Sequence, residues 1–589
     1  MNKKTVILSF SKIVISLFIA IIIFYFFSFK CNEIFPFLFF LILNFINGKN
    51  HFFQSIIKSN VNLLCIHAFT AIIISIFLIV GSCIWEEDAY ALENPIYCII
   101  IWGGVFLLLL LFDNSIRKYA YSNFVNSVLK CKIYFIVSFL IICWIPCLLS
   151  NFPGILISDA GWQWSMARGE VQISSHHPPL HTLLIWFSQK LSVLLCGTLN
   201  STIAVSLYSF IQMLLLAISF GITLKYIDSY NKSSWLFFAS IFYYALHPLN
   251  AIAGIYMTKD IVFSICILLF TLQLYSIYIT EGKFLGKNKN CFIMLFLILC
   301  ISNFRNTGTL IIIFSLLLLL WNYKAYYKKI LLLFFVLLIS IQLRNGLYDY
   351  LQITKPDIAE SLGMPINQIA RVIVNEDQVS DEDKLLINNV LDINKIKVLY
   401  NPHYSDPIKF NSAFSSEPIV NNRMDYLSLW IRMIIAHPKE CLEATANLTI
   451  GYWYPGVHKG AVSYNIQEKE NTLISIGVNP WSFSGFDKFY DYFIGTNVRE
   501  NIFLSWLFSV GNVFIFIIFC CSYLCAHKYF KAILVLAPNI LIWFTLILAA
   551  PSYCETRYFY SAFICIPLYL LLLMNSENKN IQKNYEHHL

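Results

Sequence analysis

The sequence predicts an all-α protein that crosses a membrane many times. Of its 589 residues, 58% are hydrophobic and only 13% are charged, whereas an ordinary soluble domain carries about 25% charged residues. Long apolar runs recur along the chain, and a membrane-spanning helix needs about 20 such residues. The excess of Lys and Arg, a net charge of +8, lies in short loops between these runs. That pattern orients helices in a bilayer and does not indicate nucleic-acid binding.

About fourteen segments are candidate transmembrane helices. The first begins near the N-terminus and lacks a small-residue cleavage site, so it is interpreted as a retained helix and not as a signal peptide. Both termini are expected in the cytoplasm, because the loops on that side carry the excess of Lys and Arg. The predicted spans are residues 6–28, 33–47, 61–84, 95–112, 133–150, 203–225, 235–256, 261–280, 291–303, 308–322, 329–344, 501–524, 532–549 and 557–574.

The order of apolar and polar segments divides the chain into four parts. Residues 1–132 hold N-terminal transmembrane helices, and residues 133–344 hold a transmembrane core. The first outer loop of this core covers residues 151–200. Residues 345–500 are polar enough to form an extracytoplasmic domain, which is expected to be mainly helical. Residues 501–589 carry the last transmembrane helices and a cytoplasmic tail.

Two helical regions outside the spans follow from apolar periodicity and proline positions. Residues 178–196 are predicted to form an amphipathic helix on the outer membrane surface or partly inserted in it. A full crossing there would reverse every later loop, and Gln189 and Lys190 interrupt its apolar run. In the extracytoplasmic domain, the stretch DYLSLWIRMIIAHPKECLEATANLTI predicts two helices broken at His437-Pro438.

The first outer loop contains an isolated carboxylate, Asp159, in the stretch GILISDAGWQW. A carboxylate just past the end of a span is partly desolvated and can act as a general base or bind a cation. The alternative is a solvated loop residue, or a cap for a helix beginning near Gly161. In the same loop, Arg168 and Glu170 have the alternative of an ordinary exposed ion pair.

Three histidines follow in the stretch SSHHPPLH. His177 and His181 are spaced i, i+4, so on one helix both imidazoles would face one metal ion such as zinc. The stretch lacks the glutamate of HExxH and any cysteine, so the choice between a divalent metal ion and no cofactor stays open. Hydrogen bonding to a phosphate or to a sugar hydroxyl is the other interpretation. His176, Gln163 and Glu170 are further candidates for binding substrate or metal.

Three cations from widely separated turns are predicted at the same membrane face as Asp159. Lys259 lies in YMTKDIVF, Arg305 in SNFRNTGTL and Arg557 in PSYCETRYFY. Any one of them is more often an interfacial side chain whose charged head reaches water. Together they suit a phosphate or diphosphate, which Arg binds through two parallel hydrogen bonds and Lys as a point charge.

The layout resembles that of membrane glycosyltransferases of the GT-C fold. It is closer still to a bacterial family of uncharacterised multi-spanning proteins related to the protein O-mannosyltransferases and aminoarabinose transferases. In both, a first large outer loop with an acidic residue and membrane-surface helices precedes a bundle of spans and an external domain. The segments that carry the resemblance are FPGILISDAGWQ, SSHHPPLHTLL, ALHPLNAIAGIYMTKDIVF, NFRNTGT, AHPKECLEATANLTIGYWYPG and ETRYFY.

The resemblance implies sugar transfer from a polyprenyl-phosphate donor to an envelope glycan, lipid or protein at the outer face of the membrane. By position, Asp159 matches the acidic residue of the first loop, which activates the acceptor hydroxyl in such enzymes. Lys259, Arg305 and Arg557 would then bind the lipid phosphate. Asp159 is followed by Ala160 and not by a second acidic residue, a departure from the pattern of many relatives that leaves the metal requirement open.

Two other functions fit the same pattern. A transporter of lipid-linked glycans would interrupt its spans and keep polar groups near the bilayer midplane, and His247-Pro248 near the centre of a predicted span is a candidate. A glycan polymerase or ligase with a lipid-diphosphate donor would use the same membrane face as the transferase. The sequence has no Gly-rich phosphate loop ending in GK[ST], which disfavours ATP-driven chemistry.

Overall fold

The computed structural model describes eight stretches of the chain, and within them the regular structure is helical. They are residues 61–87, 90–121, 132–230, 234–375, 379–457, 466–481, 507–549 and 552–576. The contacts of extended backbone in these stretches are isolated bridges between loops. The predicted spans at 6–28 and 33–47 lie outside the described residues.

Eight helices of the described stretches are long and apolar enough to cross a membrane. The predicted spans from 61–84 onward each overlap one of these helices, a bent helix pair or a shorter apolar helix. The eight long helices, three of them counted with an adjoining 3-10 turn, are α4 (Val61–Trp85), α6 (Pro95–Tyr121), α7 (Ile133–Ser150), α10 (Ser201–Tyr230), α13 (Lys259–Ile279), α16 (Tyr327–Tyr350), α28 (Ile533–Ala549) and α29 (Tyr560–Ser576). Helices of this length and composition are those of a multi-pass membrane protein.

The remaining apolar helices are shorter or bent. α11 (Ser234–Leu246) and α12 (Pro248–Ile255) meet at an angle of 52°, because Pro248 cannot continue the hydrogen bonding of the first helix. The shorter apolar helices are α14 (Asn288–Phe304), α15 (Gly308–Asn322) and α27 (Val510–Ala526). A shorter helix spans a bilayer only where the bilayer thins or neighbouring helices shield its ends, so the total of fourteen spans stays a prediction.

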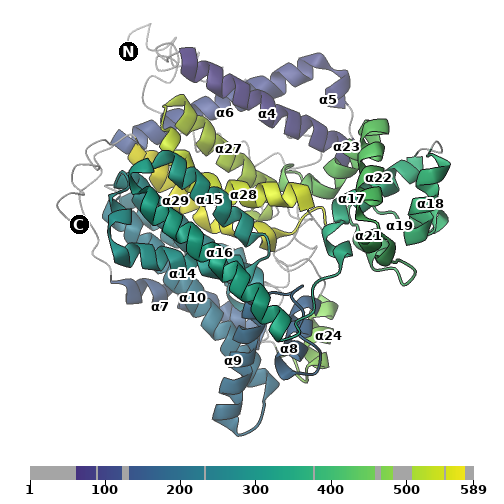
Figure 1. Ribbon diagram of the computed structural model, residues 1–589. Coiled ribbons are helices and arrows are strands. Elements are labelled where there is room, and N and C mark those ends of the chain that lie inside the picture. The colour runs from purple at the N-terminus through teal and green to yellow at the C-terminus, as the bar shows by residue number, and fades with distance from the viewer. Residues whose placement is uncertain are drawn as a thin grey trace.

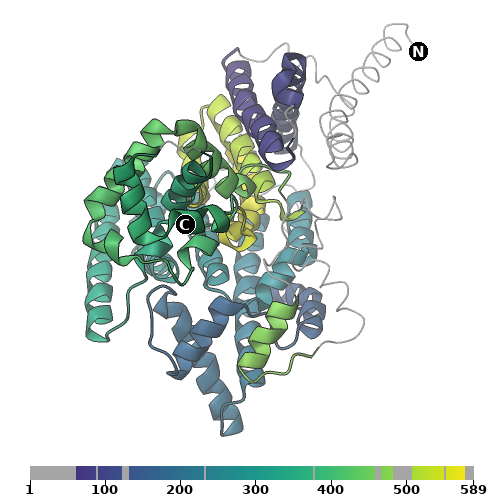
Figure 2. The same cartoon turned by 90° about the vertical axis from the view of Figure 1, so that its right-hand side faces the viewer.

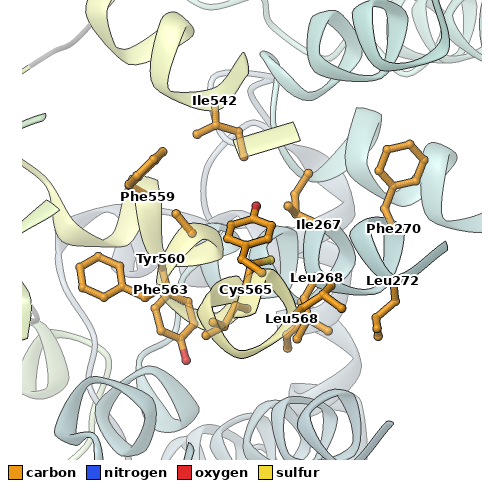
Figure 3. Close-up of a cluster of buried hydrophobic side chains, with 14 of the residues drawn as sticks. Ile267, Leu268, Phe270, Leu272, Ile542, Phe559, Tyr560, Phe563, Cys565 and Leu568 are labelled. Atoms are coloured by element: carbon orange, nitrogen blue, oxygen red, sulfur yellow. The ribbon is translucent and has the colours of Figure 1, made fainter. Parts of the chain in front are cut away.

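α13 forms the centre of the bundle, where nearly all of its side chains are buried. It packs against α10, α14, α28 and α29. Figure 3 shows its interface with the last two helices: Ile267 and Leu268 of α13 lie beside Cys565 and Leu568 of α29, and Ile542 of α28 closes the cluster. Because neighbouring helices cover α13 on most of its sides, few of its side chains are left to face lipid.

The predicted surface helix is α9 (Pro179–Cys196), which does not meet the length and hydropathy criteria for a span. Its exposed face is apolar and includes Leu183, Trp186 and Leu194, whereas its buried face is polar and includes Ser188 and Gln189. This pattern is the inverse of that of a soluble helix and suits contact with lipid. The polar face packs against α10 and α8 (Ser158–Arg168).

A second helical unit, which we call the helical domain, lies beside the ends of the long helices (Figure 1). Its core contains Ala370, Val372, Leu429 and Met433. The expected break at His437-Pro438 is confirmed, because one helix ends at Ala436 and the next begins at Pro438. The helices of this unit are α17 (Gly363–Asn375), α18 (Asp381–Val390), α19 (Ile393–Leu399), α20 (Asp406–Lys409), α21 (Glu417–Asn421), α22 (Arg423–Ala436) and α23 (Pro438–Thr449). α16 continues to Tyr350, past the expected start of this domain at residue 345.

The N-terminal helices α4 and α6, with the short helix α5 (Tyr90–Glu93) between them, pack beside α27 (Figures 1 and 2). A polar cluster joins the two parts within this apolar contact. Asp113 of α6, only 1% exposed, lies 2.7 Å from an Arg117 nitrogen and 3.6 Å from Nε2 of His67. His527, just past α27, donates to the same carboxylate, and Nδ1 of His67 lies 2.8 Å from the Ser522 hydroxyl.

Candidate functional site

Two loops are joined by backbone hydrogen bonds at the end of the bundle that faces the helical domain. The Ile155 amide donates to the Ile255 carbonyl at 3.0 Å, and the Met257 amide donates to the Ile155 carbonyl at 2.9 Å. Asp159 follows the first loop and Lys259 follows the second. Because each residue lies in the first turn of its helix, α8 or α13, the two helix starts are brought side by side.

The apolar face of α8 packs against neighbouring helices and holds α8 in place. Its Ala160 and Trp164 are buried against Leu473 of α24 (Ile466–Ser475), together with Tyr208 of α10. The helix ends at Gly169, whose φ of 76° gives the left-handed conformation that closes a helix C-terminus. Asp159 lies at the opposite end, where the positive end of the helix dipole favours a carboxylate.

Asp159 forms an ion pair with Arg557, which lies in the 3-10 turn Thr556–Phe559 before α29. An Arg557 Nη1 nitrogen lies 3.2 Å from Oδ2 of Asp159 and 3.4 Å from the Tyr256 hydroxyl. Its Nε lies 3.6 Å from Oε2 of Glu555. The structure therefore brings together a carboxylate and a guanidinium group from residues almost 400 positions apart.

Lys259 and Arg305 complete the cationic part of the site. Nζ of Lys259 lies 3.4 Å from Nδ1 of His177. Arg305 donates to the Tyr558 carbonyl at 3.1 Å, and its guanidinium group lies 4.9 Å from the centre of the Tyr558 ring. The three cations predicted from separate turns thus lie in one connected group with Asp159.

Asp260 lies between Arg305 and Arg557. Its side chain is 1% exposed, and its two oxygens lie 3.9 Å from Arg305 Nη1 and 3.9 Å from Arg557 Nε. Thr258, the N-cap of α13, donates to Oδ2 at 3.2 Å, whereas Oδ1 has no hydrogen-bond partner among the described residues. We call the group the Asp159 cluster; its members are Asp159, His177, Lys259, Asp260, Arg305, Glu555 and Arg557.

Burial and the neighbouring charges set the protonation of Asp159 and His177, which both lie outside the spans. Burial alone would raise the pKa of Asp159, but the neighbouring Arg557 and Lys259 charges outweigh it and lower that pKa to about 2. Burial, aided by the Lys259 charge, lowers the pKa of His177 to about 3. At neutral pH the site therefore presents an ionised carboxylate and a neutral imidazole.

A family model described as "Family of unknown function (DUF6020)" matches residues 164–587, more than half of the chain. The chain belongs to this family. Comparisons with curated proteins and with solved structures found no match. Within the DUF6020 match lie Lys259, Arg305 and Arg557, whereas Asp159 falls just before its start.

One predicted feature of this DUF6020 protein is wrong, namely the placing of two histidines on one helix face. α9 begins at Pro179, so His177 lies before the helix and the i, i+4 spacing to His181 has no structural meaning. His181 is fully buried, with Nδ1 2.8 Å from Gln163 Oε1 and Nε2 2.7 Å from the Tyr208 hydroxyl. In the part of the chain that the structure describes, no group of three or more His, Cys, Asp or Glu is arranged to hold a metal ion.

The other predicted candidates occupy peripheral positions. The His176 ring packs edge-on against the His177 ring, with centroids 4.5 Å apart. Gln163 is buried, where it donates to Thr182 at 3.1 Å and contacts His181. Glu170 pairs with Arg168 at 3.0 Å, and both side chains are exposed, which agrees with the ordinary ion pair weighed as the alternative.

Sequence reasoning did not assign Asp260 and Glu555 to the site, although Asp260 directly follows Lys259 and Glu555 lies two positions before Arg557. The available signal was a charge in the first turn of a long apolar helix, for Asp260, or just before such a helix, for Glu555, because a charge there needs a partner when it is buried. Tyr256 and Tyr558, whose hydroxyls contact Arg557, carried no sequence signal. Aromatic residues are common throughout this chain, at 17% of all residues.

Proposed function

We propose that this protein is a membrane glycosyltransferase that moves a sugar from a polyprenyl-phosphate-linked donor to an acceptor of the cell envelope. The supporting observation is the meeting of one half-exposed carboxylate, Asp159, with Arg557 and Lys259 at the end of a bundle of membrane-length helices. A lipid-linked donor needs this combination: a base for the acceptor hydroxyl and cations for the leaving phosphate, both at the edge of the membrane.

The proposed reaction uses these residues in defined roles. The acceptor hydroxyl oxygen attacks the anomeric carbon of the sugar, and its proton passes to Asp159. The bond between the anomeric carbon and the phosphate oxygen breaks, and its electron pair stays on that oxygen to give the lipid phosphate. Arg557, Lys259 and Arg305 stabilise the charge that develops there, since donors fixed in a partly buried site act more strongly than donors in water.

The proposal includes the wider architecture. The bundle would be GT-C-like with about fourteen spans, both termini would lie in the cytoplasm, and the Asp159 cluster would face outward. Support comes from charge placement. The basic loops Lys283–Gly286 and Lys324–Tyr326 lie at the opposite ends of α13 and α15 from Lys259 and Arg305, and basic loops favour the cytoplasmic side.

The test is transfer from defined donors in lipid nanodiscs. Purified protein would be supplied with polyprenyl-phosphate-linked hexoses and pentoses and with an envelope extract as acceptor, and sugar incorporation would be followed by mass spectrometry. Asp159→Asn lacks the general base and is expected to transfer sugar about 100-fold more slowly or worse. Arg557→Gln lacks a cation that stabilises the leaving phosphate and is expected to slow transfer by a similar factor. Transfer at the wild-type rate by Asp159→Asn would remove the proposed base.

One observation favours transport of a lipid-linked glycan as a second candidate. The 52° bend at His247-Pro248 breaks a span, which is a feature of many transporters. The imidazole there is engaged within the protein, because Nδ1 accepts from the Leu249 amide and Nε2 lies 3.2 Å from the Leu507 carbonyl. Movement of a labelled lipid-linked sugar across proteoliposomes without bond formation would favour transport over transfer.

A further inference from the structure

Arg557 already has carboxylate partners in the ligand-free cluster. Asp159, Asp260 and Glu555 all lie within 4 Å of its guanidinium nitrogens, at 3.2, 3.9 and 3.6 Å. Its side chain is only 12% exposed, so an anion approaching from outside meets a guanidinium group that is already occupied. A phosphate that binds Arg557 must therefore compete with one of these carboxylates.

The charges of the cluster also balance before any ligand binds. Its cations are Lys259, Arg305 and Arg557, and its carboxylates are Asp159, Asp260 and Glu555. Adding a phosphate to a balanced, partly buried group leaves a negative charge without a counter-charge, which is costly. The cost falls if one carboxylate moves away from the cations as the phosphate arrives.

The exposure of the three carboxylates identifies which one can move. The side chain of Asp159 is 39% exposed, compared with 11% for Glu555 and 1% for Asp260. Asp260 also accepts a hydrogen bond from Thr258, within its own helix turn. Asp159 can regain water when its ion pair breaks, whereas a separated Asp260 would remain a buried charge.

We propose that the donor phosphate displaces Asp159 from Arg557, so that Asp159 becomes free to act as a base only after the donor has bound. This inference rests on the proposed function, because it assigns the order of events at the same site. Asp260 keeps its contacts with Arg305 and Arg557 throughout and acts as a positioning residue that holds both guanidinium groups toward the phosphate.

The exchange has a chemical consequence for the base. While paired, Asp159 has a pKa of about 2 and is a weak proton acceptor. Once the phosphate takes over the Arg557 charge, the ion pair that lowers this pKa is lost, and the pKa rises toward the ordinary value of a carboxylate. The carboxylate thus becomes a stronger base in the complex that needs one, and an acceptor hydroxyl is activated only when a donor is present.

The exchange predicts that removing the carboxylate strengthens phosphate binding. Farnesyl phosphate and inorganic phosphate would each be titrated by isothermal calorimetry into the full-length protein in nanodiscs. Asp159→Asn is expected to bind farnesyl phosphate about tenfold more tightly than the wild type, a coupling of ordinary size between two competing ligands. The gain should disappear when Arg557→Gln is added, because the competition is for that guanidinium group.

Glu281→Gln is the matched control. It also removes one carboxylate, but from an exposed ion pair with Lys531 beyond the opposite end of α13. Its affinity for farnesyl phosphate should equal that of the wild type. Asp159→Ser serves as a second variant, and melting temperatures would verify that each variant is folded.

The outcomes separate the exchange from the proposed function. Equal or weaker farnesyl phosphate binding by folded Asp159→Asn and Asp159→Ser, with clear binding by the wild type, would overturn the exchange and leave the proposed donor class standing. Binding of inorganic phosphate alone, with the same tenfold gain, would keep the exchange but overturn a lipid-linked donor. No binding of either probe to wild type or variants would overturn both.

Discussion

His181 illustrates how one residue is used differently from what its sequence neighbourhood suggests. Its imidazole connects Gln163 on α8 with Tyr208 on α10. Burial, with a smaller contribution from the Lys259 charge, lowers its pKa to about 3. The residue therefore stays neutral at physiological pH and fixes the helix that carries Asp159, and it is not available as a metal ligand in this arrangement.

This buried imidazole predicts a loss of stability in mild acid. An unfolded histidine takes up a proton below about pH 6.5, whereas folded His181 resists protonation down to about pH 3. Below pH 6.5 the unfolded state therefore binds more protons, and the free energy of unfolding falls as the pH falls. Between pH 6.5 and pH 5 the contribution of one such residue is about 2 kcal/mol.

Thermal unfolding of His181→Gln measured from pH 7 to pH 5 would check this prediction. The variant should be less stable than the wild type at pH 7, because two buried hydrogen bonds change, but its melting temperature should fall less steeply with pH. His437→Gln in the helical domain is the control, and it should keep the slope of the wild type. An unchanged slope in His181→Gln would contradict the prediction.

At the scale of elements, the Asp113 carboxylate joins α4 and α6 to residues 164–587, the part of the chain that the DUF6020 model matches. The ion pair with Arg117 and the contacts to His67 and His527 lie between apolar helices, where an isolated charge is costly. Breaking a buried pair by removing one partner leaves the other charge uncompensated. The N-terminal helices are therefore expected to depend on this carboxylate for their attachment.

Asp113→Ala should lower the stability of the protein by about 3 kcal/mol, somewhat less than a fully buried pair would give, because Arg117 is 32% exposed. The measurement is the melting temperature in detergent. Gly103→Ala on the same helix is the control, since an added Cβ there meets no atom within 4 Å. Equal melting temperatures for Asp113→Ala and Gly103→Ala would show that the cluster contributes little.

At the scale of the whole molecule, the Asp159 cluster and the helical domain lie at one end of the bundle and the basic turns at the other (Figure 1). Basic turns favour the cytoplasm because membrane insertion retains them there. This arrangement is what the proposed function requires, since a donor whose sugar is used outside must meet the cluster on the outer side.

Epitope tags inserted into two exposed loops would test this orientation. A tag after Ser412 in the helical domain should bind antibody while the cell membrane is intact, provided that any layer outside it is permeable to antibody. A tag after Gly286, in the turn beyond α13, should bind only after the membrane is opened. The reverse pattern would place the Asp159 cluster in the cytoplasm and remove the outer-face transferase.

Much of the secondary structure could be predicted because apolar runs are local properties of the chain. The apolar helices from α4 onward lie where hydropathy placed them, and proline marked both the bend at His247-Pro248 and the break at His437-Pro438. The predicted start of α9 at Pro178 differs by one residue from the observed start at Pro179, because two adjacent prolines are compatible with either start. His177 lies before either start, so the i, i+4 spacing to His181 does not place both side chains on one helix face.

The sequence by itself determined the helical class, the positions of most apolar helices and the residue types at the ends of those helices. Only the tertiary structure decided that Arg557 pairs with Asp159, that Asp260 lies between two arginines, and that His181 faces Gln163. The physical reason is that hydropathy and charge sign are properties of short segments, whereas an ion pair depends on a few ångströms between side chains. Those distances are fixed by how α8, α13 and α29 pack, and this packing joins residues that are hundreds of positions apart.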